Sequence, residues 1–77
     1  DGIWADELEK TRNRVQVGDS LKVMLLADAR TKGEVRTVRR TVRVISNHRY
    51  LVRTSDGSSS TYAELAMYYR GKILDRR

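Results

Sequence analysis

The residues from 34 to 45 are almost all Val, Thr, Arg and Ile, and this run constrains the fold more than any other part of the chain. β-Branched side chains favour extended backbone, so we predict one long strand of about twelve residues. Val42 and Val44 lie in one phase of the strand alternation, whereas Ile45 lies in the other. We therefore predict a bulge or sharp bend over residues 37–40.

Several shorter antiparallel strands are predicted around this long one, from alternating apolar residues and from turn signals between them. The segments predicted as strands are 21–25, 50–54, 58–61 and 72–74. The turns or loops between them are predicted at Gly18-Asp19, 28–33, 46–48 and Asp56-Gly57. Residues 75–77 are expected to fray.

An amphipathic helix is predicted at the N-terminus, because Trp4, Leu8 and Val15 recur at spacings that place them on one helical face. Residues 1–14 would form this helix, capping an open end of a β-barrel made by residues 15–77. We expect Trp4 and Leu8 to pack over the end of the barrel core.

A second, short helical turn is predicted over residues 61–67, where Thr61 and Glu64 form a capping box, and Gly71 ends it. The fold predicted from this order is mainly β: a small five-stranded SH3-like barrel with an N-terminal helix and a short helical turn before the last strand. A five-stranded oligonucleotide-binding barrel is the nearest competitor, but it usually carries its helix between the third and fourth strands.

The core of this barrel should contain the apolar residues of the strands and of the second helical turn. These residues are Leu21, Val23, Leu25, Val42, Val44, Val52 and Leu65. We also assign Tyr62 to the core, and we expect at least one of the adjacent Tyr68 and Tyr69 to face solvent.

Positive charge is concentrated on the predicted sheet. Residues 30–53 hold eight basic side chains, seven of them Arg, against the single acid Glu34, a net charge of +7 in a chain whose total is +6. We expect Arg39 and Arg43 to face outward, with Arg53 across from them on the next strand. Because arginine binds phosphate bidentately, we predict a nucleic-acid surface. The predicted contact residues are Arg36, Arg39, Arg40, Arg43, Arg49 and Arg53.

Two other interpretations of the arginines remain open. They form a solvated sheet face, neutralised by Asp6, Glu7 and Glu9 of the N-terminal helix lying across it, or they dock an acidic protein partner. The sequence does not indicate whether the nucleic acid is DNA or RNA, whether binding is sequence-specific, or what the oligomeric state is.

Enzymatic function is not predicted. The chain has no Cys and one histidine, His48, in a predicted turn, so nothing indicates a nucleophile, a metal site or a cofactor. The longest apolar run, residues 23–27, is too short to cross a bilayer, and the acidic N-terminus is unlike a secretory signal. We expect a cytoplasmic protein that does not bind membranes.

Short motifs resemble those of a group of small phage and mobile-element proteins. The motifs are Ile3-Trp4, Gly18-Asp19-Ser20-Leu21-Lys22-Val23, Thr41-Val42-Arg43-Val44-Ile45 and Ser60-Thr61-Tyr62-Ala63-Glu64-Leu65. The resemblance implies an SH3-like barrel and an accessory role in a phage or integrated element, and it implies no activity or site residue. Gly18-Asp19 is also similar to the start of SH3-like modules in ribosomal proteins and transcription factors, an analogy of fold alone.

Overall fold

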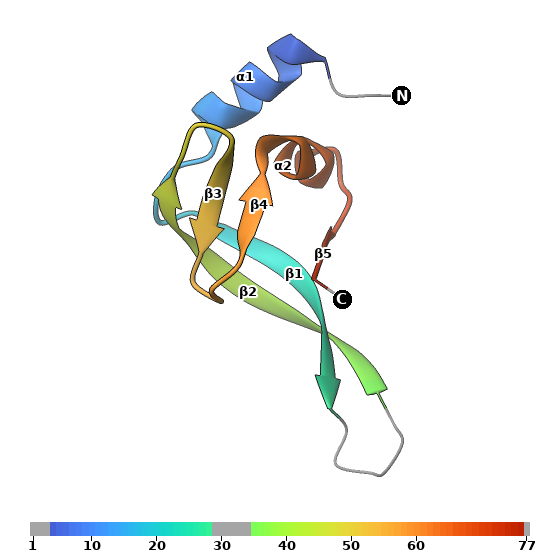
Figure 1. Ribbon diagram of the computed structural model, residues 1–77. Helices are drawn as coiled ribbons and strands as arrows, with labels where there is room; N and C mark the ends of the chain where they lie inside the picture. The colour runs from blue at the N-terminus through green and yellow to red at the C-terminus, as the bar shows by residue number, and fades with distance from the viewer. Residues whose placement is uncertain (1–3, 29–34, 77) are drawn as a thin grey trace.

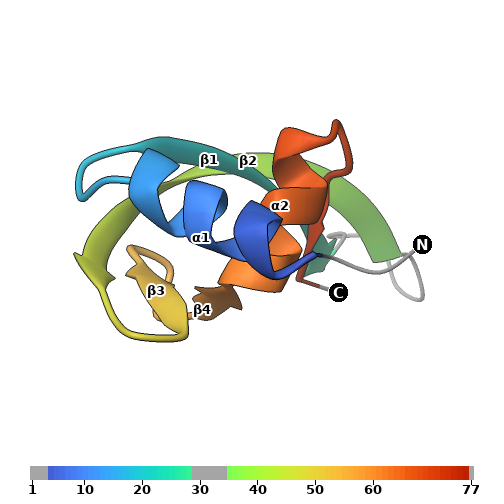
Figure 2. The same cartoon turned by 90° about the horizontal axis from the view of Figure 1, so that it is seen from above.

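The computed structural model describes residues 4–28 and 35–76. Its elements are α1 (Ala5–Arg14), β1 (Ser20–Asp28), β2 (Val35–Asn47), β3 (Leu51–Thr54), β4 (Ser59–Thr61), α2 (Tyr62–Tyr69) and β5 (Leu74–Asp75). The strands form one five-stranded sheet in the order β4-β3-β2-β1-β5, and this sheet curls into a half-barrel (Figures 1 and 2). The predicted fold class, mainly β and SH3-like with a short helix before the last strand, is confirmed.

The long strand β2 links the two halves of the sheet. It pairs with β1 without interruption from Ser20 opposite Arg43 to Asp28 opposite Val35, so the bulge predicted over residues 37–40 is wrong. The irregularity lies between Val44 and Ser46, where β2 pairs with β3. Ile45 breaks the hydrophobic alternation because it faces solvent at this point, 52% exposed. The loop predicted over residues 28–33 lies outside the described residues, apart from Asp28, which belongs to β1.

The last strand, β5, runs parallel to β1, whereas we expected antiparallel strands throughout. Val23 pairs with Leu74 and Met24 with Asp75, and the Arg76 N–H donates to the Met24 carbonyl over 2.8 Å. Residues 75 and 76 are therefore held by the sheet and do not fray. Arg77 lies outside the described residues.

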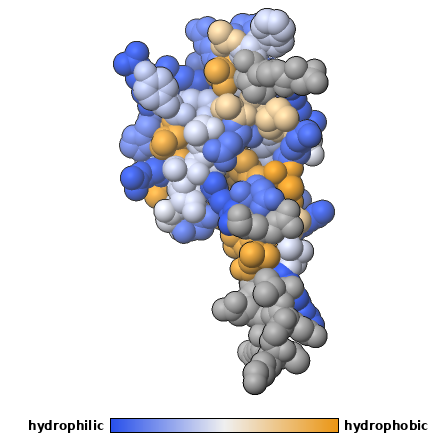
Figure 3. All heavy atoms as spheres, turned by 45° about the vertical axis from the view of Figure 1, so that its right-hand side comes forward, coloured by the Kyte–Doolittle hydropathy of each residue, from blue (hydrophilic) through white to orange (hydrophobic). Residues whose placement is uncertain are grey.

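The core fills the concave side of the sheet. Its buried apolar residues are Val15, Leu21, Val23, Val42, Val44, Val52, Tyr62, Leu65 and Leu74. Of the predicted core, only Leu25 differs, because it is half-buried at the edge of the cluster. Beyond Leu25 the β1–β2 hairpin leaves the body and projects away from both helices (Figure 1). Apolar side chains are visible at the level where it leaves (Figure 3), and Leu26 of the hairpin is 55% exposed.

The helix α2 begins at the predicted capping box. The Glu64 N–H donates to the Thr61 hydroxyl over 3.2 Å, and the Thr61 N–H donates to the Glu64 carboxylate over 3.3 Å. The adjacent Tyr62 is buried as predicted, and its hydroxyl donates to the His48 carbonyl over 2.6 Å. This bond fixes the turn between β2 and β3 against the start of α2.

The helix α1 packs on α2 across the mouth of the curled sheet (Figure 2). Thr11 and Val15 are buried and Leu8 is half-buried, so the packed face follows these three residues. Trp4 is 76% exposed, and the prediction that it packs over the core is wrong. It occupies the N-cap with extended backbone, which carries its side chain off the packed helical face. Neither α1 nor α2 is long and apolar enough to span a membrane.

Candidate functional site

Four of the six predicted contact residues lie on β2, and their side chains are all exposed. Strand alternation places Arg39 and Arg43 on the outer face of the sheet, as predicted. Arg36 and Arg40 lie in the phase of the buried Val42, which is that of the inner face. The arginines of β2 therefore form two rows on opposite faces of the hairpin, where we expected one stripe.

Arg40 shows why an inner-face residue can be exposed. It lies opposite Val23 in the β1–β2 ladder, and Val23 is fully buried. On the other edge of β2, however, β3 pairs only with residues from Val44 onward. No strand flanks β2 at Arg40 on that edge of the described sheet, so its side chain reaches solvent beyond the rim of the core.

The other two predicted contact residues lie beyond the C-terminal end of β2, in the β2–β3 turn and on β3. Arg53 on β3 pairs with Ser46 on β2 and with Ser59 on β4, so it does not lie across from Arg43 as predicted. Arg49 lies in the turn between β2 and β3, with its guanidinium carbon 5.2 Å from the centre of the Tyr50 ring. The six candidates thus separate into four on β2 and two beyond it, Arg49 in the β2–β3 turn and Arg53 on β3.

The acids of α1 do not neutralise these arginines. Glu7 binds Arg70 of α2, with the Arg70 Nε donating to a Glu7 carboxylate oxygen over 2.8 Å. Within residues 4–28 and 35–76, five of the six candidates form no ion pair: Arg39, Arg40, Arg43, Arg49 and Arg53. The helix α1 lies on α2 and does not cover the β2 arginines. The interpretation in which Asp6, Glu7 and Glu9 lie across the arginine face is therefore wrong.

Other arginines of the chain hold the fold together. The guanidinium of Arg76 donates to the Ser59 carbonyl over 2.8 Å and to the Thr54 hydroxyl over 3.3 Å, and its Nε lies 3.6 Å from a carboxylate oxygen of Asp56. Burial opposes the ionisation of Asp56, but hydrogen bonds from Thr54 and Ser58 and the charge of Arg76 outweigh it, so the pKa of Asp56 is lowered.

The tyrosines of α2 are parts of the packing. Tyr68 and Tyr69 are both half-buried against the core, so the expectation that one faces solvent is only partly met. The Arg14 guanidinium carbon lies 3.8 Å from the centre of the Tyr69 ring. Burial raises the pKa of the Tyr69 hydroxyl, with Asp19 adding to the effect. The two rings also contact each other edge to face, with their centroids 5.7 Å apart.

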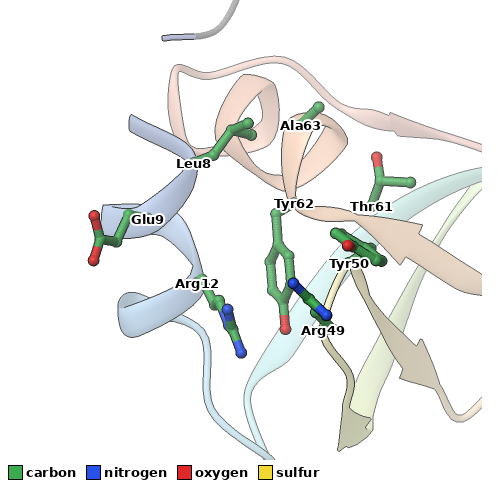
Figure 4. A pocket seen from close by; sticks show the side chains of 8 residues that line it. All are labelled: Leu8, Glu9, Arg12, Arg49, Tyr50, Thr61, Tyr62 and Ala63. Carbon is green, nitrogen blue, oxygen red and sulfur yellow. The ribbon is translucent and has the colours of Figure 1, made fainter. Parts of the chain in front are cut away.

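A groove that the sequence did not indicate lies between α1, the β2–β3 turn and the start of α2 (Figure 4). It encloses about 570 Å³. Its lining residues are Leu8, Glu9, Arg12, Arg49, Tyr50, Thr61, Tyr62 and Ala63. These come from three separate segments, so no local motif marks the groove. A local feature of the sequence that could have indicated the groove is the pair Arg49-Tyr50. In the structure the Tyr50 side chain is 69% exposed.

His48 belongs to the turn beside this groove. Its Nε2 lies 2.9 Å from the Ser46 hydroxyl, and its carbonyl accepts the bond from Tyr62. No cluster of three or more His, Cys, Asp or Glu residues that could bind a metal ion occurs in the part of the chain that the structure describes.

No protein-family model, curated protein or solved structure matches this chain.

Proposed function

We propose that this protein is a small nucleic-acid-binding module that contacts phosphates through the arginines of the β1–β2 hairpin. The observation that carries the proposal is that Arg39, Arg40 and Arg43 are exposed within five positions of one strand and form no ion pair with any described residue. No acid of the described residues neutralises these three charges, so an external anion would meet no competing partner there.

The type of cation supports phosphate as that anion. The β2 residues from Val35 to Arg43 include four arginines, no lysine and no acid. The planar guanidinium offers paired donors that match two phosphate oxygens, whereas a lysine offers a point charge. A rigid strand also fixes the spacing of the cations, so little side-chain and backbone freedom remains to be removed on binding.

The cellular setting is part of the proposal. A cytoplasmic protein without cysteine has access to nucleic acid, and the resemblance to phage and mobile-element proteins implies an accessory role there. Arg49 and Arg53 belong to the same proposal as a second, separate binding region at the other end of the sheet.

The proposal is tested by fluorescence anisotropy with labelled oligonucleotides at about 50 mM and 200 mM salt. The variant R39Q/R40Q should bind more weakly across all sequences, and its salt slope should fall by about two, because each arginine that binds a phosphate contributes about one unit. The control K10Q/K72Q removes the same charge from exposed positions in α1 and before β5, and it should bind almost as the parent does. If the parent binds no oligonucleotide at 50 mM salt, the proposal is wrong.

A second candidate function is the docking of an acidic protein partner, and the groove favours it. Leu8, Tyr50 and Tyr62 give the groove an apolar lining, and Arg12 and Arg49 stand at its side (Figure 4). An acidic peptide with an apolar anchor would match both features. Binding of such a partner should survive 200 mM salt and be abolished in R12Q/R49Q, whereas R39Q/R40Q should leave it unchanged. The opposite pattern would assign the binding to the hairpin.

A further inference from the structure

We infer that the groove beside Tyr50 binds an unpaired base of a single-stranded nucleic acid, and that Arg12, Arg49 and Arg53 around it bind the neighbouring phosphates. This inference rests on the proposed function and names its substrate class, single-stranded nucleic acid. It arises from an exposed aromatic ring that lies among arginines without acidic partners.

The Tyr50 ring is open to a ligand. Its side chain is 69% exposed, although it lines the groove together with Leu8 and Tyr62. The guanidinium carbon of Arg49 lies 5.2 Å from the centre of the ring. Aromatic rings and guanidinium planes both stack on nucleobases, and every base has a face to stack on. The pair Arg49-Tyr50 therefore offers a base two stacking groups from adjacent residues.

The backbone that carries the ring is already held in place. The His48 N–H donates to the Leu51 carbonyl over 2.8 Å, which closes the turn between β2 and β3. The Tyr62 N–H donates to the Tyr50 carbonyl over 3.3 Å, and the Tyr62 hydroxyl donates to the His48 carbonyl over 2.6 Å. The turn is thus fixed to the start of α2, so binding removes little backbone freedom.

Arginines surround the ring on separate elements. Arg49 lines three hollows of the surface: the groove itself, a second that it shares with Arg12, and a third that it shares with Tyr50 and Arg53. Arg12 belongs to α1 and Arg53 to β3, and all three arginines are exposed. None of the three forms an ion pair with a described residue. Phosphates on either side of a bound base would therefore meet cations that no acid neutralises.

The acid that lines the groove does not oppose this arrangement. Glu9 lies on α1, and its carboxylate is directed away from Tyr50 and Tyr62 (Figure 4). The negative charge is therefore on the far side of the helix from a base stacked on Tyr50.

The position of the ring selects an unpaired base. In a duplex the bases are paired and stacked between two backbones, so a side chain within a groove of the protein reaches a base face only if the base is extruded. A single strand exposes its base faces without that cost. The groove volume of about 570 Å³ falls within the range of roughly 300 to 1,000 Å³ that is typical of small-ligand sites, so it can admit a base.

An acidic peptide, the ligand of the second candidate function, is the competing occupant. Its apolar anchor would need enclosure by apolar side chains, as in the packed pockets of protein interfaces. The Tyr50 ring is instead open and lies beside a guanidinium, which favours a planar ligand that stacks on both.

The test measures fluorescence anisotropy at about 50 mM salt with four labelled ligands of equal length. These are a DNA strand, the RNA strand of the same sequence, the DNA duplex, and a DNA strand in which abasic sites replace the bases. Tyr50→Ala removes the ring, and Tyr50→Phe retains it as the matched control. R12Q/R49Q removes two of the cations, with K10Q/K72Q as the control of equal charge. Circular dichroism and melting confirm that each variant is folded.

We expect the parent to bind at least one of the two single strands more tightly than the duplex and the abasic strand. Tyr50→Ala should weaken binding of that strand roughly fivefold to a hundredfold and remove its advantage over the abasic strand, because a base stacked on an aromatic ring contributes this much. Tyr50→Phe should bind as the parent does. R12Q/R49Q should weaken binding of all four ligands, whereas K10Q/K72Q should change it little.

Equal binding of single-stranded, abasic and duplex ligands, with no effect of Tyr50→Ala, would overturn the inference but leave the proposed function intact. Absence of binding to every oligonucleotide would overturn both. A labelled peptide of glutamates around one leucine tests the competing occupant. If Tyr50→Ala weakens binding of this peptide and not of the single strands, the groove belongs to an acidic protein partner and the inference is wrong.

Discussion

Two regions of this protein use arginine in opposite ways. In the body, Arg76 and Arg70 are held by acids and carbonyls, and Arg14 covers an aromatic ring. On β2, opposite Met24 and Val23 of β1, Arg39 and Arg40 are exposed and pair with no described residue. The comparison shows that arginine content alone does not identify a binding surface, since the paired arginines are part of the fold and the unpaired ones are available to a ligand.

The largest expected difference between the regions concerns apolar residues. Leu65 is fully buried in the body, so Leu65→Ala should destabilise the protein by about 2 to 5 kcal/mol through reduced burial and a residual cavity. Leu26 on the hairpin is 55% exposed, so Leu26→Ala should change the free energy of unfolding by no more than about 0.5 kcal/mol. Urea melts measure both. Equal destabilisation would mean that the hairpin is as much a part of the core as the body is.

The next effect compares arginines directly. Arg76→Gln should destabilise the protein by about 1 to 3 kcal/mol, because it leaves the Ser59 carbonyl and Asp56 without their charged partner. Arg39→Gln should remain within about 0.5 kcal/mol of the parent. Thermal melts of the two variants under the same buffer provide the comparison. If Arg39→Gln costs as much as Arg76→Gln, Arg39 has a structural role that its exposure does not reveal.

The smallest expected effect is a pH dependence of the free energy of unfolding, which a carboxylate of the body should produce. Because the pKa of Asp56 is lowered in the folded protein, its ionised form favours folding. This contribution is complete above the ordinary value of 3.8 and is lost as the pH falls through the lower, folded value. Asp56→Asn should therefore flatten the stability profile below about pH 4, measured by urea melts from pH 2 to 6. A profile unchanged by Asp56→Asn would show that another group governs the acid response.

The order of the strands and the capping box followed from the sequence because both depend on local signals. β-Branched residues predict β2, and Thr61 with Glu64 predicts the start of α2. The sequence predicts the irregularity of β2 in the wrong place, because Ile45 departs from the alternation of Val42 and Val44 without showing where the departure begins. Exposure of Ile45 is decided by the pairing with β3, which no local pattern encodes.

The sequence identified which arginines are exposed, but it did not predict how they are arranged on the sheet. All six arginines are exposed, yet the exposure of Arg40, which lies on the inner face, depends on where β3 stops pairing with β2. The position of Trp4 was wrong because helical spacing does not tell an N-cap residue from one inside the helix. The groove beside Tyr50 needed three segments to be brought together, which is a property of the tertiary structure alone.

The hydrogen bonds between residues far apart in the sequence have a consequence for the order of folding events. The bond from the Lys22 N–H to the Tyr68 hydroxyl joins residues 46 positions apart, and the Arg70–Glu7 bond joins residues 63 positions apart. Contacts of such separation require large loops to close before any stabilisation is gained, so they form slowly. A β-hairpin such as β1–β2 forms within about 1 to 10 μs from neighbouring segments. We therefore expect the β1–β2 hairpin to form early and the contacts of α1 and α2 with the rest of the body to form last.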